Sequence, residues 1–434
     1  MRIKRIKSAL TRRHLLIFLL VLTAVPIFGI LLLSRFPGAG AQLAKPLRGI
    51  IGNEGVARLE TILFTIQDEA KMVRYQAGLA EQEAPWQGTA VALPSPTPIP
   101  TPTPTATAPA IFSPTSFPPD AEEHETATSG LLSTSVSTSI PSTPNPIVTP
   151  TSTPPPWSPP SILPFGSLVG EGVWQPYLHN SAGEVVAYRT FLQPDEERPY
   201  AIAAIVAFDL NKIRLHYVLG SDEPALAEGP HGSGLMNAAD KQPGTLLATF
   251  NGGFMASNGQ YGAMADGLVA LAAKDGYATV TIGEDGRVQI GEWGFDIAPD
   301  GSYQSWRQNA RLITQNGQIN ERVYNGSAAT WGSSINGDIV TWRSGIGLSE
   351  DGQILYFVAG PGLSMPTLAA AMSATGAYNS LLLDINETWV HFAAIRTVED
   401  ELTAEPLLTD GMDSNVDRYL KQSSRDFFYI SAER

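Results

Sequence analysis

The 434-residue sequence contains no cysteine. It therefore has no disulfide framework, no thiolate zinc site and no cysteine nucleophile. The absence of cysteine does not identify the cellular compartment, because a chain without thiols suits oxidising and reducing surroundings equally. Positive charge is also scarce: no Lys or Arg lies between Arg74 and Arg189, and the whole chain has a formal charge of −14.

The deficit of positive charge is concentrated in the C-terminal part of the chain. Residues 165–434 hold 16 basic and 32 acidic side chains, a balance near −16. A domain with this charge repels polyanions, which argues against general nucleic-acid binding. The motifs GxxxxGKS/T, HExxH and GxSxG are also absent. Their absence argues against P-loop nucleotide hydrolysis, zincin proteolysis and α/β-hydrolase chemistry.

The first 33 residues have the pattern of a membrane anchor. A basic flank at 1–14 precedes residues 15–33, which carry no charge and nearly span a hydrocarbon core of about 30 Å as a helix. The six cations of the flank predict a single-pass cell-membrane protein with a cytoplasmic N-terminus and an extracytoplasmic C-terminal domain. A cleaved signal peptide is the alternative, because Ala39-Gly40-Ala41 has a small-x-small pattern and Thr11-Arg12-Arg13 faintly resembles a twin-arginine signal. Both alternatives export the rest of the chain.

A helical neck is predicted for residues 34–93, because apolar residues recur between 54 and 83 in steps of three and four. The residues on this face are Val56, Leu59, Ile62, Leu63, Ile66, Ala70 and Val73. The face can form a homo-oligomer with a second copy of the chain, lie on the membrane, or pack against the C-terminal domain.

A disordered tether is predicted for residues 94–164, which contain 20 of the 34 prolines and 26 Ser or Thr residues. Such a segment offers too little apolar surface to offset the conformational entropy lost on folding. It is either a plain spacer or an O-glycosylated stalk.

Residues 165–434 are predicted to form a single large α+β (mixed α/β) domain rich in antiparallel strands. Asn-Gly or Asp-Gly occurs there eleven times, and both pairs accept the positive φ of tight hairpins. Strands are predicted at 201–208, 213–219, 245–250, 278–282, 288–293, 345–348 and 354–359. The last two form a hairpin, followed by a helix with Ser364 as N-cap, Pro366 in its first turn and Gly376 at its end. A buried strand at 380–385 completes a hairpin–helix–strand unit.

One candidate binding site follows the strand at 245–250. Asn251 can donate and accept hydrogen bonds, and Gly252 and Gly253 lack a Cβ, so their backbone N–H groups can approach a ligand closely. An ordinary hairpin turn is the alternative interpretation.

A second candidate site lies at the end of the strand at 380–385. Asp384, Asn386, Glu387 and His391 follow one another closely, and paired carboxyl groups can divide acid and base or nucleophile roles. The alternative is structural, with Asp384 and Asn386 ending the strand and His391 hydrogen-bonded in the core. No cofactor is predicted, although Asp384, Asn386 and Glu387 could supply oxygen ligands to Ca²⁺ if the loop curls suitably.

Arg343 is a third candidate, just before a predicted strand. Its planar guanidinium suits a phosphate or carboxylate. A salt bridge with one of the many acidic residues is the alternative.

The order of these blocks resembles that of the phosphodiester glycosidase family. The matching blocks are TFNGGFM at 249–255, YGAMADG at 261–267, WRSGIGLSEDGQILYFVAG at 342–360, LSMPTLAAAMSATGA at 363–377 and LLLD at 381–384. The resemblance covers about 201–430. It implies a mixed α/β domain that cleaves the bond between an anomeric carbon and a phosphodiester oxygen outside the cytoplasm.

Residue by residue, three parts of this sequence match the family's pattern. Residues 251–254 match the family's NGGF block, Arg343 matches its Arg before a Gly-Ile-Gly strand, and Asp384 matches the Asp that opens a DGGGS motif. The three glycines of that motif are replaced here by the residues at 385–387, and its Ser by Thr388. Because glycines permit close approach of a substrate, their loss implies a differently shaped loop.

The sequence therefore predicts an anchored extracytoplasmic glycosidase-like hydrolase acting on a phosphodiester-linked or acidic surface glycan. Asp384 is the expected base or nucleophile, with Glu387 or His391 as proton donor. Asn251, Gly252, Gly253, Arg343 and Asn386 are the expected substrate-binding residues. The alternatives are a noncatalytic glycan-binding module on a stalk, suggested by the aromatic residues nearby, and a structural envelope protein.

Overall fold

The structure is a computed structural model that describes residues 39–80, 83–86, 157–327, 330–331 and 339–433. The predicted basic flank at 1–14, the predicted membrane span at 15–33 and most of the predicted tether lie outside these residues, so those expectations stay predictions. Within the described ranges, no helix is long and apolar enough to cross a membrane.

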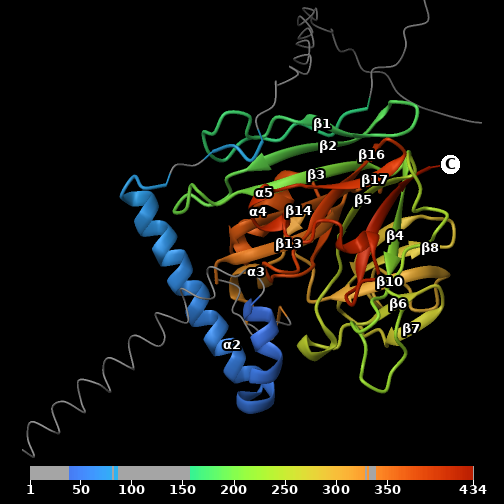
Figure 1. The fold of residues 1–434 in the computed structure, drawn as a ribbon, viewed down its shortest axis with the longest axis horizontal. Helices are drawn as coiled ribbons and strands as arrows, with labels where there is room; N and C mark the ends of the chain where they lie inside the picture. Colours follow the sequence, from blue (N-terminus) through green and yellow to red (C-terminus); the bar gives the residue numbers. More distant parts are fainter. Residues whose placement is uncertain (1–38, 81–82, 87–156, 328–329, 332–338, 434) are drawn as a thin grey trace, which may run out of the picture. The chain divides into compact units, whose positions relative to one another are not determined.

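A six-stranded antiparallel sheet has the strand order β1-β2-β3-β14-β13-β15 (Figure 1). Its strands are β1 Gln175–His179, β2 Val185–Leu192, β3 Ala203–Asp209, β13 Thr341–Leu348, β14 Ile354–Leu363 and β15 Asn379–Leu382. Every residue of β3 and β13 is buried. A strand buried throughout has both of its faces covered, so other elements pack on both sides of this sheet.

A second, five-stranded antiparallel sheet has the order β17-β16-β5-β18-β4 (Figure 1). Its strands are β4 Ile213–Val218, β5 Leu246–Asn251, β16 Phe392–Val398, β17 Glu401–Pro406 and β18 Phe427–Ala432. Phe250 in β5 pairs in register with Phe392 in β16 and with Phe428 in β18.

Aromatic packing joins the first two sheets. Phe357 of β14 lies 5.1 Å, ring centroid to ring centroid, from both Phe250 and Phe392. All three rings are fully buried. Close aromatic pairs add about 0.5–1.5 kcal/mol each beyond the burial of their area, so this cluster fixes how the end of β5 approaches the first sheet.

A third antiparallel sheet has the order β7-β6-β10-β8-β9, and β11 with β12 forms a short hairpin. The strands are β6 Ala263–Ala265, β7 Leu268–Leu271, β8 Ala278–Gly283, β9 Val288–Glu292, β10 Tyr303–Asn309, β11 Thr314–Gln315 and β12 Gln318–Ile319. Asp266-Gly267 joins β6 to β7 and Asn316-Gly317 joins β11 to β12, with positive φ at all four residues. These two pairs therefore form the tight hairpin turns that the sequence predicts.

Helices are few in the described domain. They are α3 Arg322–Asn325, α4 Met365–Ala374, α5 Thr409–Met412 and two short 3-10 helices at Ala256–Asn258 and Arg418–Leu420. In α4 the Ser364 hydroxyl accepts from the N–H of Thr367, whose own hydroxyl accepts from the N–H of Ser364. Gly376, at φ +80°, follows the helix. The predicted α4 and its cap are confirmed.

The predicted antiparallel, strand-rich fold is also confirmed. Each predicted strand corresponds to one of β3, β4, β5, β8, β9, β13, β14 and β15, with ends shifted by a few residues. The largest shifts are at the start of β13, which begins at Thr341 instead of at 345, and at the end of β14, which extends to Leu363 instead of to 359. Arg343 consequently lies inside the strand and not before it.

The helix α2 Ala39–Gln76, with a kink at Gly52, contains most of the predicted neck. It contacts the domain through Asp68, which accepts from Arg198 Nε (2.9 Å) and from the Tyr200 hydroxyl (3.1 Å). Tyr75 packs against the Tyr200 ring, and Phe64 packs against the core. On the predicted apolar face, Leu59, Ile62, Ile66 and Val73 are exposed, whereas Val56 is buried. A homo-oligomer through that face stays a prediction.

The last residues of the predicted tether are folded. Ile162 is buried, the carbonyl of Pro160 accepts from Trp174 Nε1 (2.7 Å), and Trp157 packs edge-on against Tyr188. The folded part therefore includes residues 157–164, before the predicted boundary at 165. Composition alone does not predict that residues 157–164 are folded, because only a few apolar residues among many prolines make the contacts with the domain.

Replacement of Ser364 by Ala tests the cap of α4. The change removes the side-chain acceptor for the Thr367 N–H, so we expect the free energy of unfolding to fall by about 1 kcal/mol. Denaturant unfolding monitored by circular dichroism measures the loss. Ser302→Ala, at an exposed position, is the control and should change the value little. Equal stability of both variants would show that the cap contributes nothing.

Candidate active site

Three strands from two sheets converge at Asn251, Ser344 and Asp384. Asn251 ends β5, Ser344 lies in β13, and Asp384 follows β15. Asn251 Nδ2 donates to Ser344 Oγ (3.0 Å), and Ser344 Oγ donates to the carbonyl oxygen of Asp384 (3.1 Å). The backbone N–H of Ser344 donates to the same carbonyl (3.0 Å). These bonds hold Asp384 in a fixed place at the rim of the first sheet.

The Asp384 carboxylate is buried and hydrogen-bonded at both oxygens. Oδ2 accepts from Arg425 Nη2 at 2.7 Å, and Oδ1 accepts from the N–H groups of Ile385 (2.8 Å) and Asn386 (3.1 Å). The side chain is 7 % exposed. Burial raises the pKa of Asp384 above its ordinary value, although Arg425 and the two N–H groups oppose the rise. A carboxylate with a raised pKa is a stronger base than one with the ordinary pKa.

Arg425 is the cation of this site. Its Nη2 donates to the Gly253 carbonyl (3.0 Å) as well as to Asp384, and its guanidinium lies 4.7 Å from the centre of the Trp389 ring. The Nε of Arg425 is buried and has no hydrogen-bond partner among the described residues. The guanidinium thus retains donor capacity next to the Asp384 carboxylate.

Gly252 and Gly253 are required for close packing. The N–H of Gly252 donates to the carbonyl of Asp426 (3.0 Å), and the N–H of Gly253 donates to its carboxylate (3.1 Å). A Cβ on Gly253 would come within 2.8 Å of the Arg307 guanidinium, and one on Gly252 within 2.3 Å of the Asp426 carboxylate. Both N–H groups are therefore used inside the protein, which does not favour their predicted role in orienting a sugar.

Arg343 lies in β13 next to Ser344, and adjacent residues of a strand point to opposite faces. Its Nε donates to the Leu363 carbonyl (2.8 Å) and its Nη2 to the Ile339 carbonyl (2.7 Å). The side chain is fully buried. These bonds give Arg343 a structural role on the face of β13 opposite to Ser344, and they do not favour the predicted role of binding an anionic group of a substrate.

His391 joins the network through its backbone and not through its ring. Its N–H donates to Asn251 Oδ1 (3.0 Å), while its buried Nε2 lies 3.1 Å from the Val416 carbonyl. A carbonyl only accepts, so Nε2 carries the proton. Burial, reinforced by the Arg418 cation, lowers the pKa of His391 to about 3. The ring is thus neutral near pH 7, which does not favour the predicted role of proton donor.

Asn386 and Glu387 lie in the loop after Asp384. Asn386 Oδ1 accepts from the N–H of Thr388 (2.9 Å), and Glu387 is exposed. The oxygens of Asp384 and Asn386 considered as Ca²⁺ ligands therefore accept from N–H groups in this structure. In the described part of the chain, no group of three or more His, Asp or Glu residues is arranged to hold a metal.

The sequence prediction missed Ser344, Arg425 and Asp426. Arg425 and Asp426 are adjacent, opposite charges directly before a strongly apolar strand, β18. A pair of charges in that position is a signal of buried ionic contacts, but it does not indicate their partners. Ser344 gives no signal beyond its place beside Arg343.

Part of this domain matches a protein-family model. Residues 244–384 match the family model described as phosphodiester glycosidase. The match includes Asn251, both glycines and Arg343. It ends at Asp384, the point at which the sequence departs from the family's DGGGS motif. Comparison with curated proteins gives no match.

Solved structures give similarities of low sequence identity. The zebrafish N-acetylglucosamine-1-phosphodiester alpha-N-acetylglucosaminidase catalytic domain, auto-inhibited by its pro-peptide, is 15 % identical with a TM-score of 0.38, over 60 % of this chain and 88 % of that one. A hypothetical protein from Synechocystis is 11 % identical with a TM-score of 0.33, over 60 % of this chain and 62 % of that one. The resemblance predicted from the ordered sequence blocks is confirmed by the family match, which covers residues 244–384.

Proposed function

We propose that this protein is a glycosidase-like hydrolase that acts on a phosphodiester-linked or otherwise acidic surface glycan. One observation carries the proposal: at the end of the segment that matches the phosphodiester glycosidase family model, the buried Asp384 carboxylate is paired with Arg425 beside Asn251 and Gly253. A buried carboxylate with a raised pKa and a specific charge partner marks a functional site in physical terms. Export and anchoring through residues 15–33 are part of the same proposal.

The reaction requires a base and a leaving group. A water molecule attacks the anomeric carbon and passes a proton to Asp384 as the new carbon–oxygen bond forms. The bond from the anomeric carbon to the phosphodiester oxygen breaks, and its electron pair leaves with the phosphate. Glu387, exposed in the adjoining loop, is the remaining candidate proton donor, because His391 is neutral and its Nε2 proton is engaged.

An anionic substrate needs a local cation in this acidic domain. Residues 165–434 carry 32 acidic and 16 basic side chains, and their summed field repels anions. Arg425 lies next to Asp384, whereas Arg343 is bound to backbone carbonyls on the opposite face of β13. Arg425 therefore replaces Arg343 in the proposed role of attracting the phosphodiester.

A noncatalytic glycan-binding module is the second candidate. It is favoured by the small exposure of Asp384, 7 %, and by the hydrogen bonds that both of its oxygens already accept. A catalytic base must contact the attacking water molecule. A carboxylate as enclosed as Asp384 can instead have a purely structural role. The two functions differ in whether Asp384 is needed for turnover.

Replacement of Asp384 by Asn tests the proposed reaction. We expect the full-length protein to release sugar from at least one member of a panel of sugar-1-phosphodiesters, and Asp384→Asn to lower kcat by about 100-fold or more, because the base is lost. Asp413→Asn, at an exposed position, is the control and should retain the wild-type rate.

Two results would contradict the proposal. One is full activity in Asp384→Asn. The other is wild-type protein that binds glycan tightly, releases no sugar, and binds equally well after Asp384→Asn, which would identify the binding module instead.

The pH dependence of kcat/KM tests whether Arg425 positions Asp384 and keeps it ionised. Arg425 holds the pKa of Asp384 down against the effect of burial, so Arg425→Gln should raise that pKa further. Because the base must be ionised, the fall in kcat/KM on the acid side should move to higher pH. Arg425→Lys, which keeps the charge, should move it less.

Arg396→Gln is the matched control, since Arg396 bonds Glu405 and the Tyr177 carbonyl instead of Asp384. It should leave the pH profile unchanged. An unchanged acid limb in both Arg425 variants, with both proteins folded by circular dichroism, would exclude this role for Arg425.

A further inference from the structure

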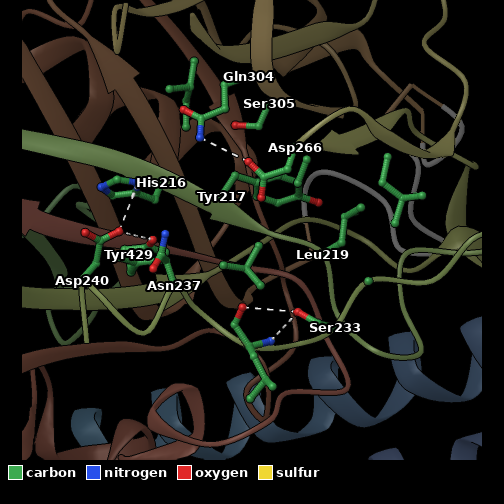
Figure 2. Close-up of a pocket in the computed structure, with 16 residues that line it drawn as sticks. His216, Tyr217, Leu219, Ser233, Asn237, Asp240, Asp266, Gln304, Ser305 and Tyr429 are labelled. Atoms are coloured by element: carbon green, nitrogen blue, oxygen red, sulfur yellow. Dashed lines mark hydrogen bonds and ion pairs between the residues drawn. The ribbon is translucent and has the colours of Figure 1, made fainter. Parts of the chain in front are cut away.

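A pocket of about 300 Å³ opens between the second and third sheets, and it contains none of the candidate site residues. This volume is at the small end of the range of roughly 300–1,000 Å³ for ligand pockets. Its walls come from β4 and β18 on one side and from β10 and the β6–β7 turn on the other. Figure 2 shows His216, Asp240 and Tyr429 close together, and Asp266 with Gln304 in a second group.

The first wall is a rigid polar surface. Tyr429 and His216 are cross-strand neighbours whose rings stack at 4.4 Å with an interplanar angle of 6°. The Tyr429 hydroxyl donates to Asp240 Oδ2 (2.8 Å). Burial and this hydrogen bond raise the pKa of Tyr429, so the phenol stays protonated and keeps donating. Asp240 is thereby held at the pocket wall.

The second wall combines polar groups with exposed apolar ones. Gln304 Nε2 donates to Asp266 Oδ1 (3.2 Å), and both residues lie at the surface. Leu268 in this wall is 39 % exposed, and Leu235 in the loop that closes the pocket is 54 % exposed. Apolar side chains among amide and carboxylate groups suit a ligand that presents both C–H and O–H groups.

The charge of the pocket excludes one class of ligand. Two carboxylates, Asp240 and Asp266, line it, and no Lys or Arg is among the lining residues in the described part of the chain. A phosphate or carboxylate group would be repelled here. The phosphodiester end of a substrate therefore does not belong in this pocket.

We propose that this pocket binds a neutral sugar residue. Carboxylate and amide oxygens accept from sugar hydroxyls, the amide and hydroxyl groups donate to them, and Leu235 and Leu268 cover C–H faces. This inference goes beyond the proposed reaction, because it assigns a second, noncatalytic glycan contact whose existence does not depend on turnover at Asp384.

The pocket adjoins the candidate active site through a buried residue. The Tyr217 side chain lines the pocket, while its hydroxyl donates to Asp426 Oδ2 (3.0 Å). Asp426 in turn accepts from the N–H of Gly253 (3.1 Å), whose carbonyl accepts from Arg425. Tyr217 and Asp426 thus separate a pocket that has no Lys or Arg among its described lining residues from a site that contains Arg425. A neutral sugar and an anionic group would bind on different sides of this partition.

Binding to the full-length protein, measured by saturation-transfer NMR and titration, tests the proposal. The probes are the methyl glycosides of glucose, galactose, mannose and N-acetylglucosamine, with glucosamine as a cationic probe and glucose 1-phosphate as an anionic one. We expect at least one neutral glycoside to bind with a measurable Kd, and to bind more tightly than the charged probes.

The variants locate the binding. Gln304→Ala and Asp266→Asn should each raise the Kd by about 3- to 10-fold, the effect of one hydrogen bond. Asn tolerates the positive φ at position 266 as Asp does, so the turn should persist. Asp300→Asn, an exposed change of the same charge, and Asp384→Asn should leave the Kd unchanged.

The proposal would be overturned by no binding of any neutral glycoside, by tighter binding of glucosamine or glucose 1-phosphate, or by neutral binding that the two pocket variants do not change. Binding that Asp384→Asn abolishes would place the sugar at the candidate active site, which also contradicts it. Turnover of phosphodiesters is measured separately, so failure of the reaction and failure of this binding site are distinguishable.

Discussion

The buried carboxylate of Asp426 is the interaction on which the candidate site depends. Its Oδ2 accepts from Arg307 Nε (2.7 Å), from the Tyr217 hydroxyl (3.0 Å) and from the N–H of Gly253 (3.1 Å). These donors come from β10, from β4 and from the residues after β5, so one carboxylate ties the second sheet to the third. Burying an ion pair is costly unless further hydrogen bonds offset the desolvation. The three donors supply such bonds to Oδ2 and fix the backbone at Gly253, whereas the buried Oδ1 has no hydrogen-bond partner among the described residues.

The neighbouring Arg425 extends this arrangement to the first sheet. Its bonds to the Gly253 carbonyl and to Asp384 connect the fixed backbone to the end of β15. Opposite charges in adjacent positions thus serve different partners: Asp426 is paired with Arg307, and Arg425 with Asp384. In a domain with twice as many acidic as basic side chains, this pairing neutralises the buried Asp384 carboxylate while its pKa remains raised.

The fold was more predictable from the sequence than the site. Strands such as β8 and β15, and the cap of α4, follow from local patterns of apolar, turn and capping residues, which the structure confirms. The site depends on contacts between residues far apart in the chain, such as the ion pair between positions 384 and 425. No local pattern encodes such a pair. Arg343 was predicted to bind an anionic group because of its residue type. In the structure it lies on the face of β13 opposite to Ser344, and its guanidinium donates to two backbone carbonyls.

The loop after Asp384 explains how the carboxylate can be held without the glycines of the family motif. Asp384 Oδ1 accepts from the N–H of Asn386, and Asn386 Oδ1 accepts from the N–H of Thr388, so two successive side chains shape the turn. None of residues 385–388 has a positive φ, and Ile385 packs into the core. The backbone here therefore does not need glycine. The loop is thus held by its own side chains, and under the proposed function a substrate would meet its exposed groups, such as Glu387, instead of an open backbone.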